Sequence, residues 1–240
     1  MPFFYFLIKM EDSITVVVCS KEHNEEKKNA FIDNINNTCG CKVHVLCVLN
    51  PDGVGLTQIY DDMLNSGKIS DNVVAFIHDD IEFLKKGWGK EILRLFSENP
   101  EYGIIGVAGA AQFDEMGAWW NYSKKYGQVL HRSEGKSWLT AFSPLLDKDL
   151  EEVCVIDGLF MAVCRDRLKS GFDTNVNKFD FYDITFCIDN FLKGVKIGVT
   201  TNIRIAHNSV GKLKESWYVN REYANKKYKD VYPININKKK

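Results

Sequence analysis

The sequence has little of several features that would assign it to a class at once. Only five of its 240 residues are proline and the formal net charge is −1, which disfavours a proline-rich linker and a strongly basic nucleic-acid surface. No apolar run reaches the roughly 20 residues that a membrane-spanning helix needs. We therefore expect a globular protein with no nucleic-acid partner and no transmembrane segment.

Cysteine is present in an odd number, seven, which argues against a complete disulfide framework. Most of the cysteines lie within apolar runs, where a thiol acts as a small hydrophobic group. Cys39 and Cys41 flank Gly40, but no second Cys or His pair follows at zinc-ligand spacing. The pattern predicts reduced thiols and a cytoplasmic protein.

Glycine-rich phosphate loops are also missing, since Asn50–Gly55 holds only a Gly-x-Gly and lacks the three glycines of a dinucleotide fingerprint. The first nine residues are apolar but have no basic start or cleavage site of a signal peptide. We predict that residues 1–11 form an N-terminal extension. Either an upstream extension before Met10 or a peripheral contact with a membrane surface would account for it.

The regular part of the sequence alternates between β-branched runs and segments with helical spacing. The predicted strands are 14–19, 43–49, 73–77 and 102–108, and the predicted helices are 25–37, 56–65 and 87–98. This alternation indicates an α/β protein with a mostly parallel central sheet flanked by helices. Later elements are a strand at 152–164, a helix from 184 to 192, strands at 195–199 and 203–207, and a final helix at 217–228.

The pattern breaks between residues 110 and 150, which are rich in tryptophan, tyrosine and glycine. We expect an irregular insertion there, since long segments without periodicity are usually lids or binding loops. Its aromatic rings could form a carbohydrate platform, or they could cover a hydrophobic sheet face. The sequence leaves both interpretations open.

Polar residues end the apolar strand at 73–77, where His78, Asp79 and Asp80 follow directly. Adjacent carboxylates repel one another unless a cation lies between them, and hard divalent ions prefer oxygen ligands. Ligands also bind at the carboxyl ends of strands in open α/β sheets. The motif predicts a metal clamp, and a solvated turn is the alternative.

Two further positions carry carboxylates that could belong to a functional site. Asp157 and Gly158 interrupt an otherwise apolar strand, and such violations are typical of functional sites. Asp183 begins an apolar helix, where the helix dipole by itself favours a carboxylate. Asp183 is therefore either a helix cap or a functional acid or base.

The order and spacing of these motifs resemble the glycosyltransferase family 2-like proteins of the GT-A fold, in particular a compact bacterial branch. The resemblance rests on His78-Asp79-Asp80, on Val155–Val163 around Asp157-Gly158, on Phe181-Tyr182-Asp183 and on His207 followed by Ser209 and Gly211. It implies a GT-A fold with a Rossmann-like, mostly parallel sheet and an aromatic-rich insertion on the acceptor side.

The resemblance also implies roles for individual residues. Asp80 and His207 would hold a divalent metal, Mn²⁺ or Mg²⁺, and Asp183 would be the catalytic base, with Asp157 beside it. The nucleotide sugar would contact Ser20, Lys21, Glu22, Asn50, Asp52, His78, Asp79 and Gly158. The sequence departs from the family pattern in three places. His78 replaces the first Asp of an Asp-x-Asp motif, Tyr182 replaces the Glu of a Glu-Asp pair, and Asn50 stands near the place of the usual nucleoside-contacting Asp after the second strand.

The implied activity is a metal-dependent, hexosyltransferase-type transfer from a nucleoside-diphosphate sugar to an acceptor hydroxyl, with inversion. The acceptor would be a glycan or a lipid-linked molecule in polysaccharide biosynthesis, at the cytoplasmic side of the membrane. The domain would span 12–211, and 212–240 would form a C-terminal helix and basic tail. The alternatives are an inactive nucleotide-sugar-binding scaffold and a sugar nucleotidyltransferase, which would usually need a glycine-rich basic loop after the first strand.

Overall fold

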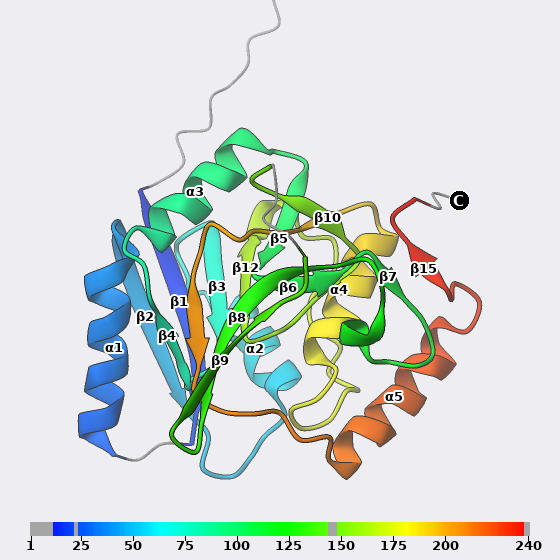
Figure 1. The fold of residues 1–240 in the computed structure, drawn as a ribbon, viewed down its shortest axis with the longest axis horizontal. Helices are drawn as coiled ribbons and strands as arrows, with labels where there is room; N and C mark the ends of the chain where they lie inside the picture. Colours follow the sequence, from blue (N-terminus) through cyan, green and yellow to red (C-terminus); the bar gives the residue numbers. More distant parts are fainter. Residues whose placement is uncertain (1–11, 22–23, 144–147, 238–240) are drawn as a thin grey trace, which may run out of the picture.

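A seven-stranded sheet forms the centre of the protein (Figure 1), which is described by a computed structural model over residues 12–21, 24–143 and 148–237. In spatial order its strands are β10 (Glu151–Val153), β13 (Lys196–Val199), β5 (Tyr102–Gly106), β12 (Phe160–Cys164), β3 (Val73–Ile77), β1 (Ser13–Ser20) and β2 (Lys42–Leu49). The predicted extension at 1–11 lies outside the described residues.

Five of these strands run in one direction. β1 is parallel to β2 and β3, and β13 is parallel to β5. β12 is antiparallel to both β3 and β5, and β10 is antiparallel to β13. The sheet is thus mostly parallel, as the alternation in the sequence predicted, with β12 and β10 as the antiparallel members.

Helices flank the sheet. Their bounds are α1 (Glu25–Cys39), α2 (Leu56–Asn65), α3 (Trp88–Glu98), α4 (Tyr182–Leu192) and α5 (Glu215–Tyr228). The α1 helix begins where the sequence predicted, because the side chain of Asn24 accepts a hydrogen bond from the backbone N–H of Lys27 at 3.1 Å. It ends at Gly40, whose left-handed backbone (φ 81°) suits a residue without a Cβ atom.

A second, smaller sheet lies against the first. Its strand order is β11 (Val155–Ile156), β6 (Ala108–Ala110), β8 (Lys125–Ser133), β14 (Ile205–His207) and β4 (Ile81–Phe83), and β9 (Lys136–Ala141) pairs with β8. Short connections between the two sheets run from β3 to β4, from β5 to β6, from β10 to β11, from β11 to β12 and from β13 to β14. We call this junction the seam.

Two local predictions were wrong. The segment 110–150 is partly regular, because β8 and β9 form an antiparallel hairpin closed by Glu134 and Gly135, both at positive φ. The strand predicted at 152–164 is three short strands, since the chain leaves the first sheet after β10 and returns to it only with β12. Both errors arise because sheet membership depends on tertiary pairing rather than on local pattern.

The C-terminal elements pack on the rest of the chain. Ala224 and Tyr228 of α5 are buried, and the hydroxyl of Tyr228 donates a hydrogen bond to the side chain of Asp189 at 2.9 Å. β15 (Ile234–Asn235) pairs with β7 (Gln112–Phe113). Within the described residues, no helix combines the length and the apolar character that crossing a bilayer requires.

Asp71, just before β3, is a buried carboxylate that ties the first strands together. It accepts hydrogen bonds from the hydroxyls of Ser13 (2.7 Å) and Thr15 (2.6 Å) on β1, and it contacts Nδ1 of His44 on β2 at 3.0 Å. Burial alone would raise the pKa of Asp71, but these three hydrogen bonds bring it below its usual range. His44 therefore has a structural role, since it connects β2 to Asp71.

Replacing Asp71 should destabilise the fold by about 1–3 kcal/mol, because Asp71→Ala leaves two buried hydroxyls without an acceptor. The measurement is the free energy of unfolding in urea, with Asp33→Ala on the exposed face of α1 as the control. Since the folded pKa of Asp71 is depressed, its contribution is present above about pH 4, near the usual aspartate value. The difference between wild type and variant should shrink as the pH falls below that value. A constant difference down to pH 2 would contradict this account.

Candidate functional site

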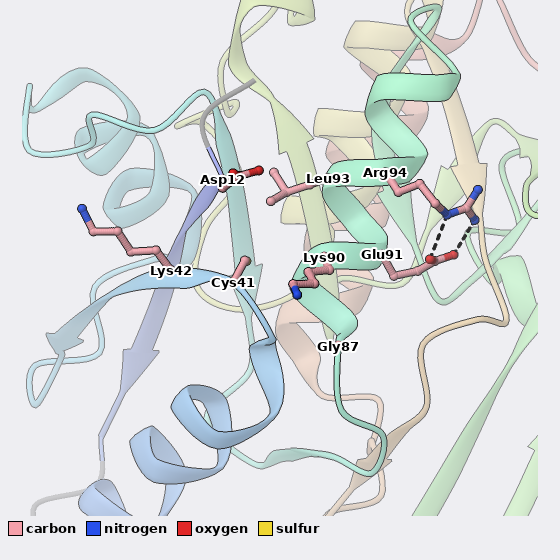
Figure 2. Close-up of a pocket in the computed structure, with 8 residues that line it drawn as sticks. All are labelled: Asp12, Cys41, Lys42, Gly87, Lys90, Glu91, Leu93 and Arg94. Carbon is pink, nitrogen blue, oxygen red and sulfur yellow. Dashed lines mark hydrogen bonds and ion pairs between the residues drawn. The ribbon is translucent and has the colours of Figure 1, made fainter. Parts of the chain in front are cut away.

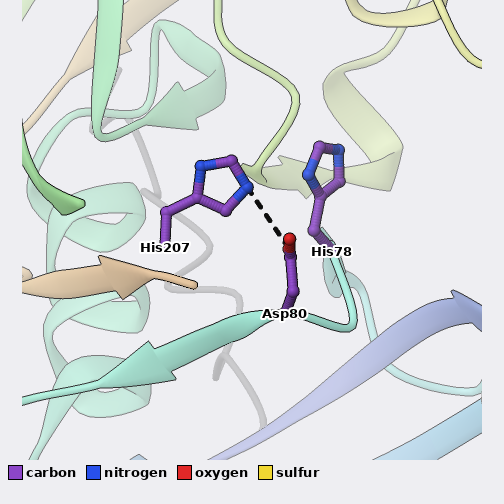
Figure 3. A group of neighbouring side chains, drawn as sticks. All are labelled: His78, Asp80 and His207. Atoms are coloured by element: carbon purple, nitrogen blue, oxygen red, sulfur yellow. Dashed lines mark ion pairs between the residues drawn. The ribbon is translucent and has the colours of Figure 1, made fainter. Parts of the chain in front are cut away.

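His78, Asp79 and Asp80 lie on the seam, in the short passage from β3 to β4 (Figure 3). The backbone N–H of His78 donates to the carbonyl of Leu159 at 3.1 Å, which joins this passage to the one between β11 and β12. The carbonyl of Asp80 accepts a hydrogen bond from the N–H of Asn208 at 2.8 Å, next to the end of β14. Three segments of the chain thus meet at one point: the β3–β4 passage, the β11–β12 passage and the segment after β14.

A cluster of three side chains at this point could hold a metal ion. One ligand atom from each of His78, Asp80 and His207 lies within 4.8 Å of the other two. Nε2 of His207 and Oδ1 of Asp80 form an ion pair at 3.3 Å (Figure 3). Apart from this contact, Oδ1 of Asp80 is buried without a hydrogen-bond partner in the described part of the chain. Two imidazoles and a buried, unsatisfied carboxylate oxygen fit a divalent cation.

Two members of the cluster, Asp80 and His78, are biased toward the forms that bind metal, whereas the third, His207, is biased toward its protonated form. Burial alone would raise the pKa of Asp80, but the neighbouring His207 lowers it to about 2. Burial lowers the pKa of His78, so its imidazole is neutral near pH 7. Burial has the same tendency at His207, but Asp80 outweighs it and the pKa of His207 is raised. An ionised carboxylate and a neutral imidazole are therefore present at neutral pH.

Two of the departures from the family pattern, His78 and Tyr182, contact each other. Nε2 of His78 and the hydroxyl of Tyr182, at the start of α4, form a hydrogen bond of 2.8 Å. Gly158 makes room for this contact, because a Cβ atom there would lie 2.1 Å from the Tyr182 hydroxyl oxygen. The bond occupies Nε2 and leaves Nδ1 of His78 for another partner.

Asp183 also starts α4 and points toward the seam. Its Oδ2 accepts the backbone N–H of Gly158 at 2.7 Å, and its Oδ1 accepts that of Ile184 at 2.8 Å. Burial raises the pKa of Asp183, and the carboxylate of Asp157 contributes, bringing it to about 7. Asp183 therefore satisfies a backbone N–H in the first turn of α4, where the helix dipole favours a carboxylate, and is also poised to exchange a proton near neutral pH.

The backbone before α4 is strained. Phe181, which precedes the helix, has φ 67°, in the left-handed region that favours glycine. Such a conformation costs on the order of 1–3 kcal/mol and persists where the surroundings fix it. The buried Phe181 ring packs edge-on against Trp217 of α5, with ring centroids 5.5 Å apart. The α5 helix thus helps to position the residues that open α4.

The other predicted donor-binding residues lie on two neighbouring loops, at the carboxyl ends of β1 and β2. Oγ of Ser20 donates to Oδ2 of Asp79 at 2.5 Å, which connects the first loop to the His78–Asp80 passage. Asn50 is buried, and its side-chain amide both donates to the carbonyl of Val54 and accepts from its N–H. Asn50 therefore shapes its own loop.

Three remaining positions complete the predicted set. Lys21 and Asp52 are exposed at the mouths of these two loops, and Glu22 lies outside the described residues. The Nζ atom of Lys21 approaches the turn at Gly53, since a Cβ atom on that glycine would lie 3.3 Å from it. The first and second loops are therefore in contact at their tips.

A row of rings that sequence analysis did not identify crosses the site. Phe179 lies 5.0 Å from His78, His78 lies 5.9 Å from His207, and His207 lies 5.8 Å from His131, measured between ring centroids. His131 in turn stacks on Trp138 of the β8–β9 hairpin at 5.5 Å. The two end rings, Phe179 and Trp138, are exposed. No local pattern marked His131, because only the parallel pairing of β8 with β14 brings it next to His207.

Comparisons with known proteins identify the family and the fold. The model of a family described as "Glycosyltransferase like family" matches residues 15–234. A crystal structure of GalNAc-T7 with UDP, GalNAc and Mn²⁺ superposes with a TM-score of 0.57 at 11% identity, covering 94% of this chain and 49% of that one. The chain thus spans about half the length of that protein. The fold is the GT-A fold, as the sequence predicted.

A second solved structure, A197 from STIV, matches with a TM-score of 0.44 at 12% identity, covering 85% of this chain and 98% of that one. This score is too low to establish a shared fold. No curated protein matches the sequence.

Removing the Tyr182 hydroxyl should weaken metal binding. Tyr182→Phe keeps the buried ring and its packing on Tyr60 but frees His78 to turn. Loss of such an outer partner typically lowers metal affinity about 10–100-fold. The measurement is calorimetric titration with Mn²⁺, with Tyr218→Phe on the exposed face of α5 as the control. Equal affinity in wild type and Tyr182→Phe would mean that His78 does not depend on this bond.

Proposed function

Because the chain belongs to the glycosyltransferase-like family, we propose that it moves a sugar from a nucleoside-diphosphate donor to an acceptor hydroxyl, in a metal-dependent and inverting reaction. One observation carries the proposal: the cluster of His78, Asp80 and His207 lies on the same seam as Asp183, whose carboxyl group has a pKa of about 7. The cluster suits a diphosphate with its cation, and the Asp183 carboxylate suits proton removal from a hydroxyl.

The donor's nucleoside would lie at the carboxyl ends of β1 and β2. Ser20 and Asn50 fix the two loops there, and Lys21 and Asp52 stand exposed at their mouths. Glu22, which follows Lys21 in the sequence, keeps its proposed role as a contact of the nucleotide sugar. Asp79, held by Ser20, would face the sugar-diphosphate end. The GalNAc-T7 structure contains UDP, which makes UDP the first nucleotide to test.

Asp80, His207 and His78 would hold the divalent ion. Mg²⁺ prefers oxygen ligands, whereas imidazole nitrogen suits softer first-row metals, so two histidines favour Mn²⁺ over Mg²⁺. When bound, the ion supplies positive charge to the leaving diphosphate. The chain's own contribution is to keep Asp80 ionised and to orient His78 through Tyr182.

Asp183 would accept the proton of the acceptor hydroxyl during attack on the anomeric carbon. A base of pKa about 7 is matched to this task at neutral pH. Attack from the face opposite the leaving diphosphate would invert the anomeric centre. The proton moves to a carboxylate oxygen of Asp183, and Asp157, nearby, favours its uptake by charge repulsion.

The acceptor would approach between the exposed rings at the two ends of the row. Aromatic faces pack well against apolar faces of sugars, and Trp138 presents such a face next to His131. This supports a glycan or a lipid-linked sugar as the acceptor. Transfer of a hexose, a role in bacterial polysaccharide biosynthesis and a location at the cytoplasmic face of the membrane remain part of the proposal.

The decisive experiment is thermal unfolding with UDP, and with other nucleoside diphosphates, in the presence and absence of Mn²⁺. A ligand at a hundredfold excess over its dissociation constant should stabilise the protein by about 2.7 kcal/mol. We expect a shift that requires both UDP and Mn²⁺, and that Asp80→Asn abolishes while Asp33→Asn leaves it intact. An equal shift in Asp80→Asn would contradict the proposed metal site, and no shift with any nucleotide would contradict donor binding.

The pH dependence of transfer should report Asp183. Below pH 7 its carboxyl group is protonated and cannot accept a proton, so kcat/KM should rise with pH and level off above about 7. Asp183→Asn should keep the UDP-dependent shift and reduce turnover by about 10²–10⁴-fold, without the rise near pH 7. Binding without turnover in wild type, across a broad panel of acceptors, would instead support an inactive scaffold. An unchanged pH profile in Asp183→Asn would place the base elsewhere.

A further inference from the structure

Two thiols lie in contact at the opposite end of β2 from the proposed site. Cys39 is the last residue of α1, Gly40 turns the chain, and Cys41 precedes β2. The Sγ atoms of Cys39 and Cys41 are 3.4 Å apart. Residues separated by one position span at most about 7 Å, and the left-handed Gly40 folds this short segment. The two sulfurs are thus close enough to be joined without a large movement of the backbone.

Packing holds one of the two thiols in place. Cys39 is fully buried, and its sulfur lies directly over Gly89 of α3, where an added Cβ atom would be 2.2 Å from it. The Cys39 side chain therefore has little room to turn away from Cys41. Cys39 is inaccessible to a large reagent but stays within reach of its neighbour.

Cys41, in contrast, opens onto a hollow of about 900 Å³ between β2 and α3 (Figure 2). The lining includes Lys42 and Lys90 together with Asp12 and Glu91, and in Figure 2 Lys90 lies on the α3 side of Cys41 whereas the Lys42 side chain extends away from it. The thiol hydrogen bond with Cys39 lowers the pKa of Cys41, and Lys90 lowers it further; together they outweigh burial and the charge of Asp12, which act in the opposite direction. Cys41 has the access and the local positive charge that make a thiolate nucleophilic.

We propose that Cys39 and Cys41 form a redox-active dithiol that reacts with anionic low-molecular-weight disulfides entering the hollow, with Cys41 as the attacking thiol and Cys39 as the resolving thiol. Oxidised glutathione is the probe, since its carboxylates suit the lysines that line the hollow. The pair lies at the other end of the sheet from Asp80 and Asp183, so the proposal does not depend on glycosyl transfer.

The exchange proceeds in two balanced steps. The Cys41 thiolate attacks one sulfur of the glutathione disulfide, the S–S bond breaks, and one glutathione leaves as a thiolate while a mixed disulfide forms on Cys41. Cys39 then gives up its proton, its sulfur attacks the Cys41 sulfur, and the second glutathione leaves. Overall, two protein thiols are oxidised to one intramolecular disulfide, and one disulfide is reduced to two glutathione thiols.

The test is to incubate the full-length protein with oxidised glutathione, alkylate the remaining thiols and measure tryptic peptides by mass spectrometry. Cleavage after Lys28 and Lys42 releases the peptide 29–42, which carries both cysteines and no others. We expect this peptide to become two hydrogens lighter and to escape alkylation. Cys19 and Cys47, which are also partly exposed, serve as internal controls and should stay alkylated.

Variants separate the two roles. Cys39→Ser should trap the glutathione adduct on Cys41, because the resolving thiol is gone, whereas Cys41→Ser should leave the buried Cys39 unmodified. Lys90→Gln should slow formation of the adduct several-fold without changing the free energy of unfolding. The proposal is overturned if the peptide 29–42 stays fully alkylated, if Cys19 and Cys47 react as fast, or if Cys41→Ser and Cys39→Ser give the same adduct.

Discussion

The structure depends on a constraint at the end of β3: the chain must leave one sheet and enter another within three residues. Backbone groups in such a passage lose their ladder partners and have to be satisfied elsewhere. Here His78 donates to Leu159, in the passage from β11 to β12, and Asp80 accepts from Asn208, in the segment that follows β14. The gathering of polar side chains at this seam follows from that need, and the candidate site is built on it.

In the proposed metal site, His78 stands where the family resemblance implies an acidic residue, which would change the chemistry of the cluster rather than remove it. A neutral imidazole in place of a carboxylate would lower the negative charge near Asp80 and make the proposed ligand set softer. An imidazole also needs its second nitrogen to be engaged if it is to hold one orientation. The Tyr182 hydroxyl meets this need, and Gly158 leaves the space for it. The three residues form one unit, although each lies in a different part of the chain.

Carboxylates at two ends of the molecule show how surroundings decide the behaviour of the same group. Asp71 is surrounded by hydroxyl and imidazole groups that donate to it, and its pKa falls. Asp183 is buried near another carboxylate, Asp157, and its pKa rises to about 7. The first therefore stabilises the ionised, folded protein, whereas the second opposes its own ionisation and is suited to accept a proton. A position in the first turn of a helix and a chemical role are compatible in the same side chain.

The sequence by itself determined the mostly parallel sheet, the bounds of α2, those of α1 and α3 to within two residues, and the place of His78–Asp80 at a strand end, because these depend on local periodicity, capping and turn residues. It also marked Asp157 and Gly158 as exceptions to local rules and Asp183 as a carboxylate at a helix start, whereas His207 was identified through the family resemblance. Only the tertiary structure decided that the segment 152–164 divides between two sheets, that His131 stands beside His207, and that Tyr182 supports His78. These contacts join residues far apart in the chain through strand pairing and helix packing, and a single sequence carries no local signal for such pairing.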